Sequence, residues 1–302
     1  MTTCRSYHHE QDYAAIDEFL IRMAQEFPDY EGWPQPRWEY MHSHPGLDRD
    51  HLDAIGVWES EGEIVGLVHH EGKMGVLYIQ LDPRFSSLNK EMMAYAAEHL
   101  AGVFKIGKAV HVYIDDTNPD LERAAAELGY EKLPAGFDEP HTRLIIPDPF
   151  PEISVPDGFR IQSLDDEFDV AKVHRVMHRG FDHDGEPPAD ELDDRRRKLS
   201  APNFRRDLTI VAVSEEDGAY VSFAGIWPVP GSTSCYLEPV ATDPDYRRMG
   251  LGRATVMEAV RRCVLEGATV AFGGADTPFY LSMGFQLYRR RCAWRKIIEP
   301  KA

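Results

Sequence analysis

The chain has few cysteines and no long hydrophobic run. Its four cysteines, Cys4, Cys235, Cys263 and Cys292, are scattered and form no C-x-x-C pair. This spacing argues against a disulfide scaffold and against a cysteine zinc site. No apolar run approaches the roughly 18 residues that a membrane helix needs, and the start of the chain has no apolar stretch of the signal-peptide type. We therefore expect a cytoplasmic protein with no membrane-embedded part.

Basic residues are also scarce relative to acidic ones. Lysine and arginine total 33 and aspartate and glutamate total 51, which gives a formal net charge of -18. A field of this sign repels nucleic acid and raises the local concentration of cationic small molecules. The acidity is partly local, because seven acids lie in the segment 182–194, directly before the basic run 195–198. We expect no nucleic-acid partner.

The length of 302 residues suits two domains better than one core. Three prolines, Pro147, Pro149 and Pro151, fall within five residues, and such a run cannot lie inside a helix or a central strand. We therefore expect an N-terminal domain at 1–146, a stiff linker at 147–157 and a C-terminal domain at 158–302.

The second half alternates strand and helix patterns. β-Branched and alternating runs predict strands, and apolar residues at helical spacing predict helices. Asp165 or Asp166 is the expected N-cap of the first helix. The expected strands are 159–163, 208–213, 220–227, 234–242, 269–272 and the segment from 285 onward; the expected helices are 170–177, 250–263 and 278–283.

The first half repeats this order. Gly66, Pro83 and Gly129 correspond to Gly225, Pro244 and Gly284, at offsets of 159, 161 and 155 residues. Nearly constant offsets over so many elements indicate a duplicated α/β domain. The expected strands are 5–7, 56–58, 64–69, 75–81 and 110–114, and the expected helices are 13–27, 89–103 and 120–128.

One segment of the second half carries the signature of a phosphate-binding turn. A strand stops at Pro244, and Arg247-x-x-Gly250-x-Gly252 then opens a helix. The glycines allow close backbone approach, and the first helical turn offers unpaired N–H groups at the positive end of the dipole. A Rossmann site needs a third glycine where this chain has Thr255, and the Gly-Lys-Ser/Thr of a Walker A loop is absent. The segment therefore predicts a pyrophosphate cradle.

This turn resembles the signature of the GNAT family, the Gcn5-related N-acetyltransferases. A second signature fits too, because Phe279-Tyr280-Leu281-Ser282-Met283-Gly284-Phe285 is similar to the family's Leu-Tyr-x-x-x-Gly-Phe. The resemblance covers nearly all of residues 158–298. It implies a mixed, mostly antiparallel sheet flanked by helices in each half, acetyl-CoA as co-substrate, and no metal.

The resemblance also assigns the cofactor contacts. It implies that the strand end binds the acetyl carbonyl and the pantetheine arm, and that the following turn takes the pyrophosphate. The residues that it names are Val240, Ala241, Thr242, Arg247, Arg248, Met249, Gly250, Leu251, Gly252 and Arg253. Gly273 departs from the family, in which many relatives carry an asparagine.

Direct attack by an amine on a thioester needs a base and an acid. Tyr280 stands where the family keeps its general acid, and its phenol, with an ordinary pKa of about 10, stays protonated at neutral pH. Glu238 lies on the strand that ends at the acetyl site, and we expect it to be the base. Asp276 and the segment 182–184 are rival bases, and Glu238 is equally compatible with a solvated or ion-paired role.

The first half has lost this machinery. The cradle positions are occupied by Ser86, Asn89 and Glu91, and Glu91 would place an anion where the pyrophosphate should lie. Ala125 stands at the position that corresponds to Tyr280, although Asn118 falls where the family has its asparagine. We expect a GNAT-like domain that no longer catalyses; residual binding of another ligand is the weaker alternative.

The acceptor is less defined. Asp182, Asp184 and Glu186 border the acceptor side in this fold, so we expect them to hold a small cationic primary amine; a solvated loop paired with 195–198 is the alternative. A non-enzymatic acyl-CoA-binding or regulatory module and a mycothiol-synthase-like acetyltransferase remain alternatives for the whole chain.

Two further clusters of residues are explained more simply without a functional site. His174 and His178, near Asp182 and His183, have helical spacing, but no His-Glu-x-x-His pattern supports a metal site. The aromatic cluster Tyr30, Trp33, Trp38 and Tyr40 either lines a pocket or packs a core edge, and packing is the commoner outcome.

Overall fold

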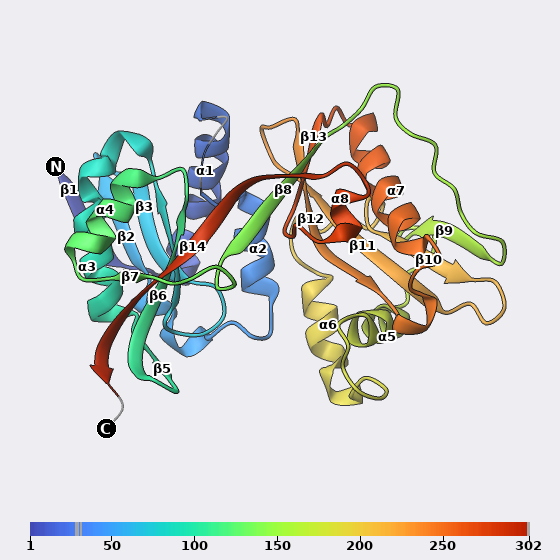
Figure 1. Cartoon of the computed structure of the whole chain (residues 1–302), viewed down its shortest axis with the longest axis horizontal. Coiled ribbons are helices and arrows are strands. Elements are labelled where there is room, and N and C mark those ends of the chain that lie inside the picture. Colours follow the sequence, from blue (N-terminus) through green and yellow to red (C-terminus); the bar gives the residue numbers. More distant parts are fainter. Residues whose placement is uncertain (28–29, 31, 301–302) are drawn as a thin grey trace. The chain divides into compact units, whose positions relative to one another are not determined.

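The computed structural model describes residues 1–27, 30 and 32–300. The chain divides into two compact units, and each is described by itself (Figure 1). Unit 1 comprises Met1–His141 together with Tyr288–Ala302, and unit 2 comprises Thr142–Leu287.

Unit 1 is a sheet in the order β1-β2-β3-β4-β6-β14, with β5 beside β6 and β7 beside β14. Its neighbouring strands are antiparallel except for β4 and β6, which are parallel. The strands are β1 Thr2–Ser6, β2 Gly56–Ser60, β3 Glu63–His70, β4 Val76–Leu81, β5 Gly102–Phe104, β6 Gly107–Asp115, β7 Glu131–Lys132, β8 Glu139–Ile145 (which continues into unit 2) and β14 Gln286–Pro300. The helices are α1 His9–Glu26, α2 Gln35–Ser43, η1 Arg49–Ala54, η2 Pro83–Leu88, α3 Asn89–His99 and α4 Pro119–Glu127.

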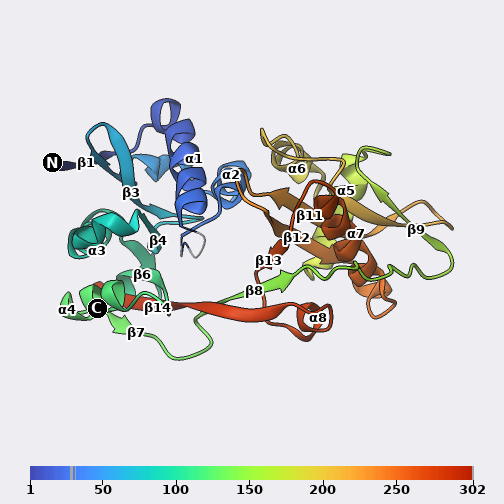
Figure 2. The same ribbon diagram turned by 90° about the horizontal axis from the view of Figure 1, so that it is seen from above.

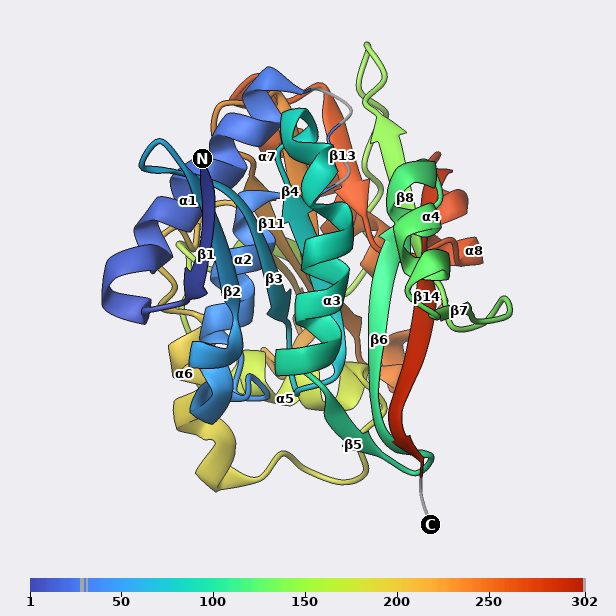
Figure 3. The same ribbon diagram turned by 90° about the vertical axis from the view of Figure 1, so that its left-hand side faces the viewer.

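Helices cover both faces of this sheet. Figure 2 shows α1 and α3 on opposite sides of β3 and β4, and Figure 3 shows α3 and α4 together on one face. Successive strand residues point to opposite faces. Trp58, Val68 and Leu77 accordingly pack in the core under α3 and α4, whereas their neighbours Val57, Leu67 and Tyr78 pack in the core under α1 and α2.

Unit 2 is a sheet in the order β8-β13-β12-β11-β10-β9. Only β12 and β13 are parallel neighbours; the other pairs are antiparallel. The strands are β9 Phe159–Ser163, β10 Ile210–Ser214, β11 Tyr220–Pro228, β12 Ser234–Thr242 and β13 Val270–Gly273. The helices are α5 Val170–Gly180, η3 Ala189–Glu191, α6 Leu192–Lys198, η4 Pro244–Tyr246, α7 Leu251–Leu265 and α8 Pro278–Leu281.

In unit 2, too, successive strand residues point to opposite faces of the sheet, so each face has its own core. Ile210 and Ala224 lie in the core under α7 and Phe285, while Val211 and Phe223 lie in the core under α5. The mixed α/β architecture, with a mostly antiparallel sheet flanked by helices in each unit, agrees with the fold class expected from the sequence.

The unit limits differ from the expected limits 1–146 and 158–302 because the closing strands are exchanged. The segment 142–145 of β8 comes from the first half but pairs with β13 of unit 2. The segment 291–300 of β14 comes from the second half but pairs with β6 of unit 1. The expected linker 147–157 has no helix or strand, and its Phe150 and Ile153 pack against the core of unit 2.

Several local expectations need correction. The helix expected at 89–103 ends at His99, because Gly102 opens β5 and passes so close to Met74 that a Cβ there would lie 2.0 Å from the Met74 carbonyl oxygen. The N-cap of α5 is Asp169, whose Oδ1 accepts from the amides of Ala171 (2.9 Å) and Lys172 (3.1 Å). Asp166, one of the two expected caps, instead accepts from the amide of Ser163.

Two helices were missed. The helix α2 follows Pro34 and contains Trp38, which is fully buried in the core of unit 1 together with Trp33. The helix α6 occupies the acidic-to-basic run, where ion pairs one turn apart join Asp193 to Arg196 (2.5 Å) and Asp194 to Arg197 (3.1 Å). This charge order, acids first and bases last, complements the helix dipole.

None of the described helices is long and apolar enough to span a bilayer. Within the same described residues, no group of three or more histidines, cysteines or carboxylates is arranged to hold a metal ion. His174 and His178 lie against the carbonyl oxygens of Pro188 (3.1 Å) and Asp184 (3.2 Å).

Candidate functional site

The strand end expected to bind the cofactor lies at a fork between β12 and β13. These strands pair only from Ser234 to Tyr236, and β12 then continues to Thr242. The amide of Asp243 donates to Val221 on β11 (3.0 Å). Alternation in an antiparallel ladder therefore turns the backbone groups of Thr242 and Val240 away from β11, toward the fork.

A bulge shapes the strand just before this edge. The register between β11 and β12 passes from Ala224↔Val240 to Ile226↔Leu237, which leaves one extra residue at Glu238 and Pro239. Gly225 faces the bulge, and a Cβ on it would lie 2.6 Å from the Glu238 carbonyl oxygen. That oxygen also accepts from Nε1 of Trp227 (2.8 Å). The bulge thus depends on a glycine beside it and on a buried donor.

The predicted cradle begins directly after the strand. Arg248 and Gly250 have positive φ values of 65° and 88°, so the chain turns sharply into α7. The first hydrogen bond of α7 runs from the amide of Ala254 to the carbonyl oxygen of Gly250 (3.0 Å). The amides of Leu251, Gly252 and Arg253 come before it, so they lie in the first turn, where helix amides have no partner within the helix. A Cβ on Gly250 would meet nothing within 4 Å, so open space lies beside this turn.

Gly252 has a packing role. A Cβ on it would lie 2.9 Å from Oγ1 of Thr242 and 3.1 Å from the Phe279 ring. The end of β12, the first turn of α7 and the helix α8 therefore meet at this one position. This close contact is what brings the strand edge, the helix N-terminus and the segment around Tyr280 into one site.

The arginines of the turn differ in the contacts that they make. The guanidinium of Arg247 donates to the carbonyl oxygens of Thr242 (3.1 Å) and Gly180 (2.9 Å) and pairs with Asp182 (2.8 Å). It therefore fixes the strand end against the end of α5. Arg253 donates to the Ser282 carbonyl (3.0 Å), while Arg248 and Met249 are exposed beside the turn.

Tyr280 lies half-buried on α8, against Phe279 and Phe285 at ring separations of 5.0 and 5.4 Å. Burial, followed by the nearby charge of Glu238, raises the pKa of Tyr280 above its ordinary value. The Glu238 carboxylate is therefore within electrostatic range of the Tyr280 phenol. The phenol stays protonated and is available as a proton donor.

Glu238 is half-buried on β12. Lys198, the last residue of α6, lies in the same electrostatic neighbourhood: burial lowers its pKa to about 8, with Arg195 acting in the same direction and Glu238 opposing. Glu238 and Lys198 are therefore within electrostatic range of each other. Sequence reasoning treated Lys198 only as part of a basic run.

The three acids expected at the acceptor are exposed at the end of α5. Asp182 pairs with Arg247, and Glu186 pairs with Arg175 at 3.3 Å. Asp184 accepts from His178 through its backbone oxygen. Neither the Asp182–Arg247 pair nor the Glu186–Arg175 pair involves the basic run 195–198. Asp276, a rival base, is half-buried shortly before α8.

Unit 1 keeps the framework of this site and lacks its cradle. Asp82 and Asp243 are both buried at the strand end and accept from the amide two residues later. In unit 1, however, η2 runs directly into α3, and the amide of Asn89 is bonded to Ser86. Glu91 accepts from Nε1 of Trp58 (2.7 Å).

The remaining equivalents in unit 1 are structural. Ala125 is fully buried in the core, and Asn118 caps α4 by accepting from the Leu121 amide (3.0 Å). The register of β4 on β3 is continuous from Leu77 to Leu81, so the bulge of β12 has no counterpart there.

Sequence reasoning did not find the roles of four residues at this site: Gly225, Trp227, Lys198 and, for its packing, Gly252. Gly225 carried a signal, because it matches Gly66 in the duplication, and Pro239 inside a strand is a signal for a bulge; the two were not connected. Lys198 carried no sequence signal, because whether it comes near Glu238 depends on where α6 lies.

Comparisons with known proteins find one matching family and several similar folds. Residues 172–285 match the family model described as Acetyltransferase (GNAT) family. A GCN5-related N-acetyltransferase from Sphaerobacter thermophilus has a similar structure, with 18% identity and a TM-score of 0.59, covering 100% of this chain and 97% of that one. A comparison with curated proteins finds no match.

Two further solved structures share the fold. A tandem GNAT protein from the clavulanic acid biosynthesis pathway is 14% identical, with a TM-score of 0.65 and full coverage of both chains. A GCN5-related glucosamine N-acetyltransferase region of a fungal multi-domain GH3 beta-N-acetylglucosaminidase is 15% identical, with a TM-score of 0.57, covering 98% of this chain and 38% of that one. The tandem arrangement of two such α/β units therefore has a full-length structural counterpart.

Proposed function

Because the chain carries a GNAT-family segment at residues 172–285, we propose that unit 2 is an acetyl-CoA-dependent N-acetyltransferase. Its acceptor is the primary amine of a small cationic molecule. The observation that carries the proposal is the meeting of three elements at Gly252: the free edge of β12, the unbonded first turn of α7, and α8 with Tyr280.

The residues present fit acetyl-CoA. The backbone groups of Val240 and Thr242, which point away from β11, offer donors and acceptors for an amide-bearing arm, while Ala241 between them pairs with Phe223 on β11. The turn from Arg248 to Arg253 offers helix amides and positive charge for a pyrophosphate, with open space beside Gly250. Acetyl-CoA supplies the acetyl group as an activated thioester.

Glu238 and Tyr280 then serve the proton transfers. The carboxylate of Glu238 accepts a proton from the acceptor's ammonium, which frees the nitrogen lone pair. As the C–N bond forms and the C–S bond breaks, Tyr280 donates its phenol proton to the departing sulfur. The positively charged nitrogen of the new amide then loses its second proton, which restores the phenol. The buried setting that keeps this phenol protonated supports the role.

Unit 1 has no catalytic role in this proposal. Its first helical turn is occupied by backbone bonding and by Glu91, and Ala125 stands in place of the proton donor. A non-enzymatic acyl-CoA-binding module is the alternative for the whole chain. The presence of Tyr280 beside an open cradle in unit 2 favours the enzyme.

The test is a screen of amines with detection of the free thiol of released CoA. The panel comprises polyamines, aminoglycosides, amino acids, peptide N-termini and the amine of a mycothiol precursor. We expect thiol release with a cationic amine. The variant Gly250→Val, which forces a β-branched residue into a positive-φ position, should abolish both turnover and acetyl-CoA binding measured by calorimetry.

The matched control is Asn89→Val at the equivalent position of unit 1, which should leave acetyl-CoA binding intact. Equal loss in both variants would contradict a single active unit. Acetyl-CoA binding without thiol release for any amine would favour the binding module over the enzyme.

A further inference from the structure

Unit 1 contains a cavity of about 550 Å³ that the proposed reaction does not use. It lies where β4 and β6 diverge, because these strands pair only at Val76 and Leu77. We call it the fork cavity. Its lining includes the rings of Trp33, Tyr78 and Tyr113, the polar residues Ser86 and Asn118, and Asp115 with Arg291. Its volume is that of an ordinary small-molecule site.

The fork cavity is unsuited to a phosphate-bearing ligand. The turn after β4 runs without a break through η2 into α3, and the Asn89 amide is already bonded to Ser86. The carboxylate of Glu91 lies in the first turn of α3, where a pyrophosphate would need positive charge. The ligand of this cavity therefore lacks the nucleotide half of a coenzyme.

Aromatic rings form one wall of the cavity. The rings of Tyr78 and Tyr113 are stacked at 5.4 Å with an interplanar angle of 15°, and Trp33 contacts Tyr78 at 4.8 Å. The guanidinium of Arg37 lies over Trp33 (4.2 Å), held by Glu71 at 2.6 and 2.8 Å. Such a wall is rigid and apolar, and it suits the hydrophobic part of a ligand.

Two opposite charges lie side by side in the lining. Asp115 on β6 and Arg291 on β14 are direct cross-strand partners, and each is only 5% exposed. Asp115 accepts from Thr117 Oγ1 (2.7 Å) and pairs with Arg289 (3.4 Å), while Arg291 donates to the Gly32 carbonyl (3.1 Å). Cross-strand partners hold their side chains about 5 Å apart at Cβ, a spacing that one small molecule can bridge.

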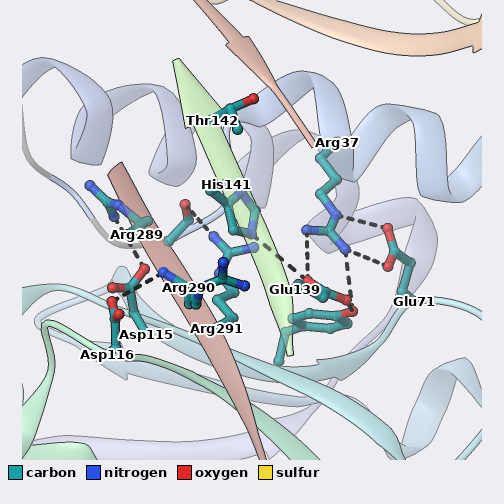
Figure 4. Close-up of polar contacts among 12 residues, drawn as sticks. Arg37, Glu71, Asp115, Asp116, Glu139, His141, Thr142, Arg289, Arg290 and Arg291 are labelled. Carbon is teal, nitrogen blue, oxygen red and sulfur yellow. Dashed lines mark hydrogen bonds and ion pairs between the residues drawn. The ribbon is translucent and has the colours of Figure 1, made fainter. Parts of the chain in front are cut away.

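The charged side chains around Asp115 and Arg291 balance one another. The two other acids of the lining, Glu26 and Asp120, are exposed and pair with Arg84 and Arg123. Figure 4 shows Arg37 between Glu71 and Glu139, and Asp115 beside the arginines of β14. Arg37, Arg289 and Arg291 thus face Glu71, Glu139 and Asp115. Burial and the charge of Arg291 hold the pKa of His141 far below its ordinary value, so this histidine is neutral. A ligand with a net charge would upset the balance in a poorly solvated place, whereas a zwitterion would not.

We propose that the fork cavity binds a small zwitterion of the α-amino-acid type with an apolar or aromatic side chain. Its ammonium lies at Asp115, its carboxylate at Arg291, and its side chain against the wall of Tyr78 and Tyr113. The ligand acts at a site separate from the one proposed for acetyl transfer, so the inference does not depend on that function.

The backbone of β4 adds polar groups for such a ligand. The amide of Asp82 donates to Val65 on β3 (2.8 Å), so the ladder turns the backbone groups of Leu81 and Ile79 away from β3 and toward the cavity that both residues line.

The test is calorimetry on the full-length protein with the common L-α-amino acids as titrants, at up to about 10 mM, where even a Kd of about 1 mM is resolved. We expect saturable one-to-one binding of an apolar or aromatic member. Its N-acetyl and methyl-ester forms, which lack the ammonium and the carboxylate respectively, should bind at least about tenfold more weakly, a loss of about 1.4 kcal/mol. Gly250→Val should bind the amino acid normally.

Matched variants locate the site. Ser86→Trp fills the cavity mouth from an exposed position and should abolish binding, while Ser87→Trp, exposed but outside the lining, should not. Asp115→Asn should weaken binding about tenfold, whereas the exposed neighbour Asp116→Asn should not. The proposal is overturned if no amino acid binds, if binding ignores both Ser86→Trp and Asp115→Asn, or if pantetheine binds in a manner that Ser86→Trp abolishes.

Discussion

At the scale of single residues, the proposed chemistry depends on the protonation state of Tyr280. Its pKa is raised by burial and by Glu238, so the phenol remains a donor throughout the range in which amines are acetylated. Tyr280→Phe removes the proton and keeps the ring packed against Phe279 and Phe285. We expect kcat to fall by about 10²–10⁴-fold, with acetyl-CoA affinity nearly unchanged.

The pH profile separates this role from packing. Because the raised pKa places Tyr280 deprotonation above pH 10, the wild-type rate should show no alkaline decline from this group below that pH. The loss in Tyr280→Phe should therefore be the same at each pH. An unchanged kcat in stopped-flow measurements of the chemical step would reduce Tyr280 to a packing residue.

At the scale of elements, the site depends on a bulge that only a glycine neighbour permits. Gly225→Ala would place a Cβ 2.6 Å from the Glu238 carbonyl oxygen, so β12 must shift. We expect a stability loss of about 1–3 kcal/mol and a fall in kcat/KM of about 100-fold from misplacement of the strand edge. Thermal unfolding and steady-state kinetics measure the two effects.

Gly274→Ala is the matched control in the same unit, because a Cβ there would meet nothing within 4 Å. It should leave both the melting temperature and kcat/KM near those of the wild type. Full activity in Gly225→Ala, with its melting temperature lowered as expected, would remove the bulge from the mechanism.

The elements also show what the sequence could predict. The bounds of β9 and β12 match the expected 159–163 and 234–242, because each is a short apolar or alternating run between turn residues. The helix α2 was missed because its buried residues include Gln35, Arg37 and Glu39, so its pattern is not amphipathic. The sharp turn at Gly250 could be predicted, because a positive φ favours glycine and so leaves a direct trace in the sequence; that this turn binds a phosphate stays a prediction. The bulge at Glu238 also leaves a trace, Pro239 inside the strand, but the bulge was not predicted from it.

At the scale of the whole molecule, the exchange of closing strands could not be predicted. A strand pattern states which faces are buried, and it does not name the partner strand. β14 was therefore assigned to the half of the chain in which it lies, whereas its segment 291–300 completes the sheet of unit 1. Unit 2 is in turn closed by the segment 142–145, which precedes the linker. Arg291, a lining residue of the fork cavity, reaches unit 1 only through this exchange.

The net charge of -18 makes a prediction for the whole molecule as well. A cationic acceptor is steered toward an acidic protein, and salt shortens the Debye length from about 10 Å at 0.1 M to about 3 Å at 1 M. The KM for the amine should therefore rise with ionic strength. Neutralising Asp182, Asp184 and Glu186 together should raise KM at low salt and flatten this dependence.

The ion pairs of these acids sharpen the experiment. Asp182 holds Arg247 and Glu186 holds Arg175, whereas among the described residues the Asp184 carboxylate has no ion pair. Asp184→Asn alone should accordingly raise the KM for the amine. Asp182→Asn should instead raise the KM for acetyl-CoA, because Arg247 fixes the strand end beside the cradle. If the acids serve only to stabilise the loop, none of these substitutions will change the KM for the amine; an acceptor that proves neutral or anionic would contradict the steering argument whatever the salt data show.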